Sequence, residues 1–183
     1  MMRVTTLFIL AAFVLSLGFA GASYAESDIG FKGIGGRIGY VDPESEIDGT
    51  ITFGVVADLG EWTDNLRWDA ALTYWSTGEE AGQWEWTWSD IALRSGVKYH
   101  FLDGEWQPYA GGGLGIHMYS IDFDGPSTYT GWDDSETEFG FYIVGGVSHQ
   151  FNEQWKAGAE LQLDWADPDQ TNIQVNVIYL LGK

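Results

Sequence analysis

The chain has 183 residues, with 8 Lys and Arg against 27 Asp and Glu, no Cys, and a formal net charge of −19. This charge excludes nucleic acid as a partner, because binding to a phosphate backbone requires a basic surface. The absence of Cys excludes disulfides, thiolate zinc sites and cysteine nucleophiles. The 10 Trp, 9 Tyr and 10 Phe argue against a disordered chain.

Residues 1–25 have the pattern of a cleaved secretory signal peptide. Arg3 supplies a positive charge, residues 7–17 are almost wholly apolar, and Ser23 and Ala25 place small residues before a cleavage site. An N-terminal membrane anchor is the alternative, but an apolar run of roughly 11 residues is shorter than the ~20 that a spanning helix needs. We therefore predict cleavage after Ala25 and a mature domain of residues 26–183.

Strands dominate the predicted mature domain, because apolar and polar residues alternate along most of its length. The clearest example is 155–165, WKAGAELQLDW, in which every odd-numbered residue is apolar and both end residues are Trp. Side chains in a strand alternate between faces, so this segment has one apolar and one polar face. The alternation predicts eight strands, at about 30–41, 49–59, 66–77, 84–101, 107–122, 137–151, 155–166 and 171–181.

The polar face of these strands distinguishes a membrane barrel from a soluble one. It carries charges of both signs, namely Arg37, Arg67, Asp69, Asp90, Arg94, Lys98, Lys156, Glu160 and Asp164. Such charges can pair inside a narrow lumen while the apolar face meets lipid and closure satisfies the backbone. We predict an all-β fold, an eight-stranded antiparallel up-and-down transmembrane β-barrel whose lumen these side chains plug. A soluble periplasmic lipocalin-like binding barrel is the alternative.

The connections between the predicted strands alternate in length. The segments 60–65, 102–106 and 152–154 are short, and each adjoins or contains a Trp: Trp62, Trp106 and Trp155. Because transmembrane barrels have short periplasmic turns and longer extracellular loops, we expect these turns and both termini on the periplasmic side. We expect Trp62, Trp106, Trp155 and Trp165 at the membrane interfaces.

Trp84, Trp86 and Trp88 alternate and therefore share one face of the predicted strand 84–101. If the alternation of faces along the strand is counted back from Ile91, the three tryptophans point into the lumen, whereas an interfacial girdle needs them to point outward. A β-bulge between 88 and 91 would reconcile the two. We predict the bulge and the girdle, with a lumen lid or a stacking platform for a sugar or an apolar ligand as the alternatives.

The longer connections are acidic. Taken as 42–48, 77–85, 122–138 and 167–170, they hold 15 of the 27 carboxylates and no Lys or Arg. A solvated surface that repels anions explains this. The sharper hypothesis is divalent-cation binding that bridges to lipopolysaccharide, with Asp122 and Asp124 as ligands because hard cations prefer oxygen donors. We predict no other cofactor. The sequence does not identify the ligand of the extracellular loops.

Three segments resemble the eight-stranded outer membrane β-barrel family, the OmpA-, OmpX- and OmpW-like proteins of Gram-negative bacteria. They are QPYAGGGLGIHMYSID (107–122), FGFYIVGGVSHQFNEQWKAGAELQLDW (139–165) and GGRIGYV (35–41). The resemblance implies an outer membrane location, contact with lipid and lipopolysaccharide, and insertion by the barrel-assembly machinery. The chain departs from the family by ending in Tyr179-Leu-Leu-Gly-Lys183 instead of an aromatic residue.

Some small barrels of this kind modify lipid A with Ser and His. Here His149 adjoins Ser148, and neighbours on a strand point to opposite faces. The His-x-Ser pattern of the PagL-type deacylases is absent, although a cross-strand Ser–His pair stays open. We therefore predict a non-enzymatic protein with a structural or surface-interaction role, such as envelope integrity, adhesion or binding through acidic extracellular loops. A narrow pore or conduit for small or hydrophobic molecules, as the OmpW-like resemblance implies, is the alternative.

Overall fold

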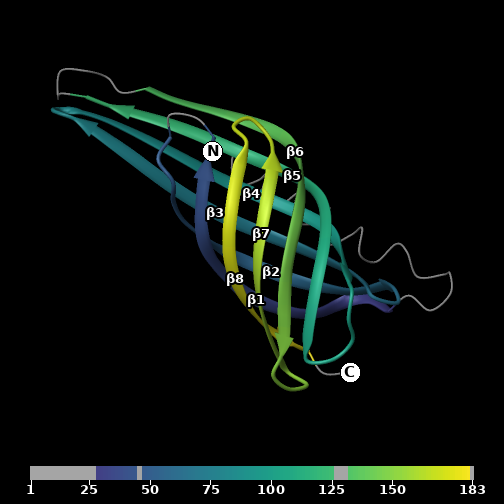
Figure 1. The fold of residues 1–183 in the computed structure, drawn as a ribbon. Helices are drawn as coiled ribbons and strands as arrows, with labels where there is room; N and C mark the ends of the chain where they lie inside the picture. The colour runs from purple at the N-terminus through teal and green to yellow at the C-terminus, as the bar shows by residue number, and fades with distance from the viewer. Residues whose placement is uncertain (1–27, 45–46, 126–131, 182–183) are drawn as a thin grey trace.

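A computed structural model, which describes residues 28–44, 47–125 and 132–181, shows eight strands in one closed barrel (Figure 1). The strands are β1 (Asp28–Pro43), β2 (Thr50–Thr63), β3 (Leu66–Ala81), β4 (Trp84–His100), β5 (Trp106–Asp124), β6 (Trp132–Gln150), β7 (Trp155–Trp165) and β8 (Gln170–Leu180). Every pairing is antiparallel, and β1 pairs with β8 to close the ring. The predicted fold class and strand number are confirmed.

Side chains alternate between the inside and the outside of the barrel. In β8, Gln174 and Asn176 are buried whereas Ile173 and Val175 are exposed. Every strand contributes outward apolar side chains, such as Phe139, which is 77% exposed, to an apolar band that is stable in contact with lipid. Within the described residues, no helix is long and apolar enough to cross a membrane.

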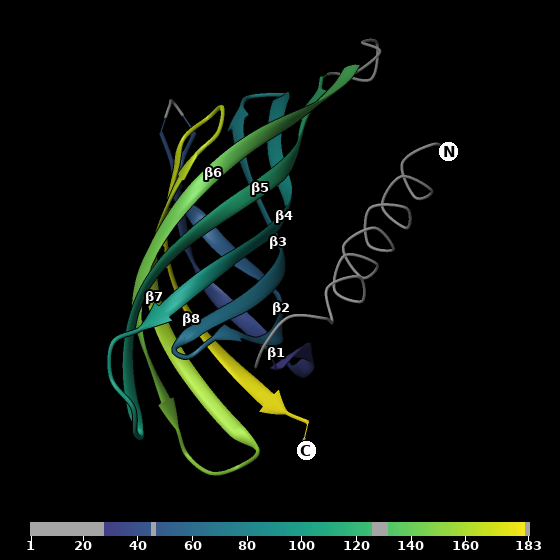
Figure 2. The same cartoon turned by 90° about the vertical axis from the view of Figure 1, so that its right-hand side faces the viewer.

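One end of the barrel holds the short connections 64–65, 101–105 and 151–154, and we call it the short-turn end. The start of β1 lies there because Asp28 is in register with Glu61. The end of β8 lies there too, because the Leu180 amide donates to the carbonyl of Gln154. Figure 2 shows β1 beginning and β8 ending at this end.

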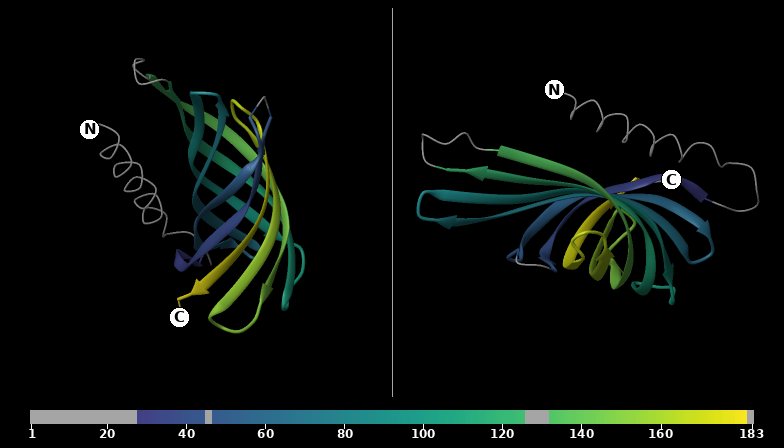
Figure 3. Two further views of the ribbon diagram at one scale, coloured as in Figure 1. Left: turned by 90° about the vertical axis from the view of Figure 1, so that its left-hand side faces the viewer. Right: turned by 90° about the horizontal axis from the view of Figure 1, so that it is seen from above.

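At the opposite end the four middle strands continue as a flap, defined as residues 76–81 of β3, 84–89 of β4, 119–124 of β5 and 132–138 of β6. The register of β2 with β3 ends at Thr52–Trp75, and that of β6 with β7 ends at Phe141–Trp165. The strands β3 to β6 remain paired with one another beyond these positions and project past the other hairpins (Figures 1 and 3).

The flap corrects the prediction of long loops at 77–85 and 122–138. Most of their described residues belong to strands, and β3 and β4 are joined at 82–83 by a tight turn in which Gly82 has a φ of +71°. Carboxylates are abundant on both sheet faces of the flap, and this acidic composition indicates loops when the sequence is read alone. Cross-strand pairing nevertheless keeps these residues in the sheet.

Inward glycines make room for large side chains in this narrow barrel. Tyr142 of β6 is in register with Gly113 of β5, which is in register with Gly96 of β4. A Cβ atom on Gly96 would overlap the Tyr142 hydroxyl group, so the Tyr142 ring crosses the inner surface above Gly113. Tyr142 is thereby buried and packs with Tyr109 and Val144.

Candidate functional site: the barrel interior and the flap

Glu160 is the central acceptor of the barrel interior. Its carboxylate accepts hydrogen bonds from Arg37 of β1, from Lys98 Nζ of β4 at 2.9 Å and from Tyr109 Oη of β5 at 2.7 Å. Lys98 also pairs with Asp69 at 2.5 Å. The Glu160 side chain is fully buried. This network joins five strands across the lumen.

A second network lies nearer the flap. Arg94 donates from Nε to Asp164 Oδ1 at 2.9 Å and from Nη1 to Thr73 Oγ1 at 2.6 Å. Asp164 also accepts hydrogen bonds from the side-chain amides of Gln162 and Asn172, each at 2.9 Å at Oδ2. A buried carboxylate with this many donors remains satisfied without bulk water.

The third group surrounds His117 at the base of the flap. His117 Nδ1 lies 2.9 Å from Asp90 Oδ2 and 3.3 Å from the hydroxyl of Tyr119. The Gln170 amide donates to Asp90 at 3.1 Å and to Tyr119 at 2.9 Å. The other histidines contact different partners: His149 Nδ1 lies 3.1 Å from the carbonyl oxygen of Glu105, and His100 packs against the Tyr109 ring.

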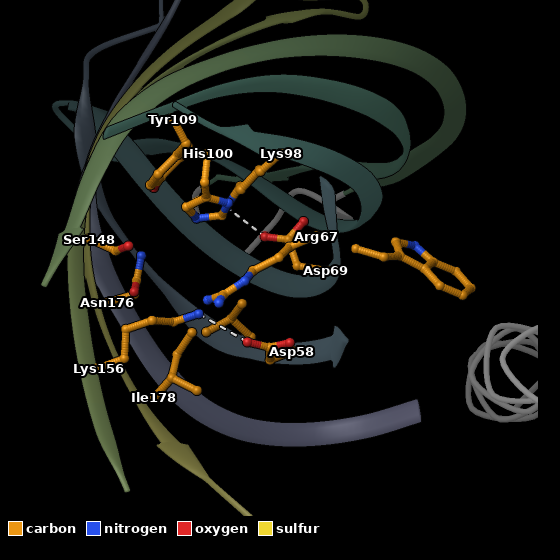
Figure 4. A pocket seen from close by; sticks show the side chains of 12 residues that line it. Asp58, Arg67, Asp69, Lys98, His100, Tyr109, Ser148, Lys156, Asn176 and Ile178 are labelled. Carbon is orange, nitrogen blue, oxygen red and sulfur yellow. Dashed lines mark hydrogen bonds and ion pairs between the residues drawn. The ribbon is translucent and has the colours of Figure 1, made fainter. Parts of the chain in front are cut away.

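A small cavity remains toward the short-turn end (Figure 4). Its volume of about 40 Å³ is large enough for only a few water molecules. Figure 4 shows Lys156 directed at Asp58, which it pairs with at 2.9 Å, and Lys98 directed at Asp69. A wider pocket of about 370 Å³, lined in part by Arg67, lies beside the short turns.

All members of the predicted lumen set lie on the inner face. Six are buried and three are partly buried around the cavity: Arg37, Asp90, Arg94, Lys156, Glu160 and Asp164 in the first group, and Arg67, Asp69 and Lys98 in the second. The predicted lumen set leaves out Asp58, Tyr109, His117 and the inward amides of β8, which also lie inside the barrel. The alternation in β2 and β8 carries the signal for Asp58 and for the amides, because both share the parity of the polar face.

The predicted interfacial tryptophans divide into two groups. Trp62, Trp106, Trp155 and Trp165 are exposed at strand ends, the first three toward the short-turn end and Trp165 toward the flap end. Trp165 stacks on Phe141 with ring centroids 5.0 Å apart.

Trp84, Trp86 and Trp88 contradict the predicted bulge. The register of β4 with β3 is unbroken from Trp84 to Tyr99, and its register with β5 is unbroken from Glu85 to His100. The three tryptophans therefore share the face of Asp90, which is buried in the lumen. They form part of the inner face of the flap, because the hydrogen-bonded ladder continues without an inserted residue that would rotate the strand.

The two carboxylates predicted as cation ligands lie on the outer face of the flap. Asp122 and Asp124 share this face of β5, and each is in register with another carboxylate, Asp133 and Glu85 respectively. In the described part of the chain, no group of three or more His, Asp or Glu side chains is arranged to hold a metal ion.

Comparisons with known proteins agree with this architecture. The model of the outer membrane protein beta-barrel domain family matches residues 10–179. No curated protein matches the chain in sequence.

Solved barrels share the fold at low sequence identity. Neisserial surface protein A is 15% identical with a TM-score of 0.61, over 81% of this chain and 96% of that one. Ail of Yersinia pestis is 14% identical with a TM-score of 0.59, over 82% and 97% of the two chains. The N-terminal barrel of Pseudomonas aeruginosa OprF is 15% identical with a TM-score of 0.54, over 83% and 99%. The family match spans nearly all of the strands, and the chain therefore belongs to the outer membrane protein beta-barrel domain family.

Proposed function

We propose that this small outer membrane barrel is a plugged, non-enzymatic base that holds its flap outside the cell, where the flap contacts a partner. The filled interior carries this proposal: Glu160 and Asp164 each bind donors from several strands, and the small cavity among the ion pairs has room for only a few waters. An eight-stranded barrel is just wide enough for side chains to fill.

The charge of the flap supports its extracellular placement. Its outer face carries Glu80, Glu85, Asp122, Asp124 and Asp133, and carboxylates on that side cannot lie in the hydrocarbon layer without a large cost. The flap therefore extends beyond the membrane. The predicted cleavage of the leader and the predicted periplasmic position of the short turns are consistent with this orientation.

Ail provides a contrast in partner chemistry, because that protein was crystallised with the heparin analogue sucrose octasulfate. The segments 76–89 and 119–138 of this chain contain no Lys or Arg. Their carboxylates would repel such a polyanion, so we expect a partner of different charge.

Planar-bilayer recording tests the plug. We expect the refolded wild-type protein to give no stepwise current in concentrated KCl, and the double variant Arg37→Ser/Glu160→Ser to give one, because it removes a central ion pair. The variant Lys32→Ser/Asp28→Ser, which removes an exposed pair at the short-turn end, is the matched control and should stay silent. Steady conductance of the wild type would favour the pore instead.

A further inference from the structure

The inner face of the flap combines an aromatic stripe with carboxylates on both sides. Trp84, Trp86 and Trp88 follow one another on this face of β4, and Phe123 of β5 stacks on Trp84 with ring centroids 5.3 Å apart. Trp86 contacts the same ring at 5.1 Å. The stripe is accessible, since Trp84 is 36% exposed and Trp86 and Trp88 are partly exposed.

The cross-strand register places carboxylates along both borders of this stripe. On β3, Glu79 is in register with Trp86. On β6, Asp134 is in register with Ile121 and Glu136 with Tyr119, both inward residues of β5. Glu79, Asp134 and Glu136 are exposed.

The two faces of the flap differ in a way that solubility does not explain. The outer face has carboxylates with Ser, Thr and Gly, and these residues suffice for a solvated sheet. The inner face alone has the indoles. Exposed aromatic side chains outside the lipid band, rimmed by polar groups, mark an interaction surface.

The carboxylates on the β6 border crowd one another. A hydrogen bond with Glu138 and the negative charge of that residue raise the pKa of Glu136, and Asp134 and Asp167 add to the shift. A cationic partner would relieve this repulsion.

We propose that the inner face of the flap binds an extended basic polypeptide segment, whose Lys or Arg side chains stack on Trp84, Trp86 and Trp88 and pair with Glu79, Asp134 and Glu136. Alternate residues of a strand are about 6.6 Å apart, and an extended peptide alongside β4 has the same spacing as the tryptophans. Trp is the aromatic side chain that attracts a cation most strongly. This inference rests on the proposed surface role of the flap and specifies its partner.

The test measures binding of a fluorescein-labelled peptide of alternating Arg and Thr to the full protein in nanodiscs of zwitterionic lipid, by fluorescence anisotropy. The inner-face variant Glu79→Gln/Glu136→Gln is compared with the outer-face variant Glu80→Gln/Asp133→Asn. Both remove two negative charges from the same two strands, β3 and β6, so they weaken nonspecific attraction equally. We expect the inner-face variant to raise Kd by about tenfold and the outer-face variant to leave it within about twofold.

The aromatic contribution is separated by Trp86→Leu, with Trp62→Leu at the short-turn end as its control. We expect weaker binding of the Arg-Thr peptide for Trp86→Leu and unchanged binding for Trp62→Leu. Equal losses for the inner-face and outer-face carboxylate variants would overturn the proposal, as would equal binding of a Leu-Thr peptide. If the wild-type protein gives no current in planar bilayers and exposes its flap on cells, and yet does not bind the basic peptide, the partner assignment fails while the proposed surface role stands.

Discussion

Glu160 illustrates how single residues hold the barrel interior together. Its carboxylate pairs with both Arg37 and Lys98 and also accepts a hydrogen bond from the Tyr109 hydroxyl. Removing one partner from a buried ion pair is costly because the remaining charge loses its compensation without regaining water. The interior therefore depends on this acceptor more than on any exposed pair.

Substituting Glu160→Gln should lower the free energy of unfolding by about 3 kcal/mol, because the buried Arg37 would lose its counter-charge and the partly buried Lys98 would lose one of its two carboxylate partners. Urea unfolding in detergent micelles, followed by the gel shift between boiled and unboiled samples, measures the change. Glu61→Gln is the control: Glu61 pairs with Arg67 at 3.0 Å while 44% exposed, and such pairs contribute at most about 1 kcal/mol. Equal losses for both variants would contradict the prediction.

At the scale of the strands, the sequence predicts which side chains face the lumen but not where the barrel ends. Alternation assigned Arg37, Glu160 and the other lumen residues to the inner face, because the period of two is fixed by strand geometry. It could not show where the barrel ends, since the same alternation continues from Arg94 in the lumen to Trp86 in the flap. The predicted bulge arose from the assumption that exposed tryptophans belong at the lipid interface.

The interactions across the lumen were beyond prediction for a different reason. Arg94 and Asp164 are distant in sequence, and which cation meets which carboxylate depends on the register of all strands between β4 and β7. A single sequence contains the partners but not that accumulated register. The contact of His117 with Asp90 likewise depends on the register between β4 and β5, in which Ala92 lies opposite His117.

The outer face of the flap holds a row of like charges whose effect can be measured. Glu85 is in register with Glu80 of β3 and with Asp124 of β5. Like charges directly opposite one another destabilise a sheet. Substituting Glu85→Lys converts two repulsive pairs into attractive ones, each worth roughly 0.2–1 kcal/mol.

We therefore expect Glu85→Lys to slow amide hydrogen exchange in β3 and β4 of the flap at low ionic strength, with a smaller difference in concentrated salt. Glu153→Lys, an equal charge change in the short turn 151–154, should leave flap exchange unchanged. Unchanged exchange for Glu85→Lys, or the same slowing for Glu153→Lys, would show that the row does not limit flap stability.

At the scale of the whole molecule, the two ends of the barrel differ in charge and shape. The flap end carries carboxylates on both sheet faces and no Lys or Arg, whereas the cavity toward the short-turn end combines Arg67, Lys98 and Lys156 with Asp58 and Asp69. The apolar band between them fixes the barrel in the membrane, so each end meets a different compartment. The proposed function requires the flap to meet the exterior.

Single-cysteine labelling can test this orientation cleanly, because the chain has no Cys of its own. We expect a membrane-impermeant maleimide to label Glu80→Cys in the flap on intact cells, since this exposed side chain lies on the outer face. Glu153→Cys in a short turn should be labelled after the outer membrane is permeabilised and not before. Both sites are exposed carboxylates at sheet ends, so a difference in labelling reports the compartment and not reactivity. The reverse pattern would place the short turns outside, and it would separate the flap from any extracellular partner.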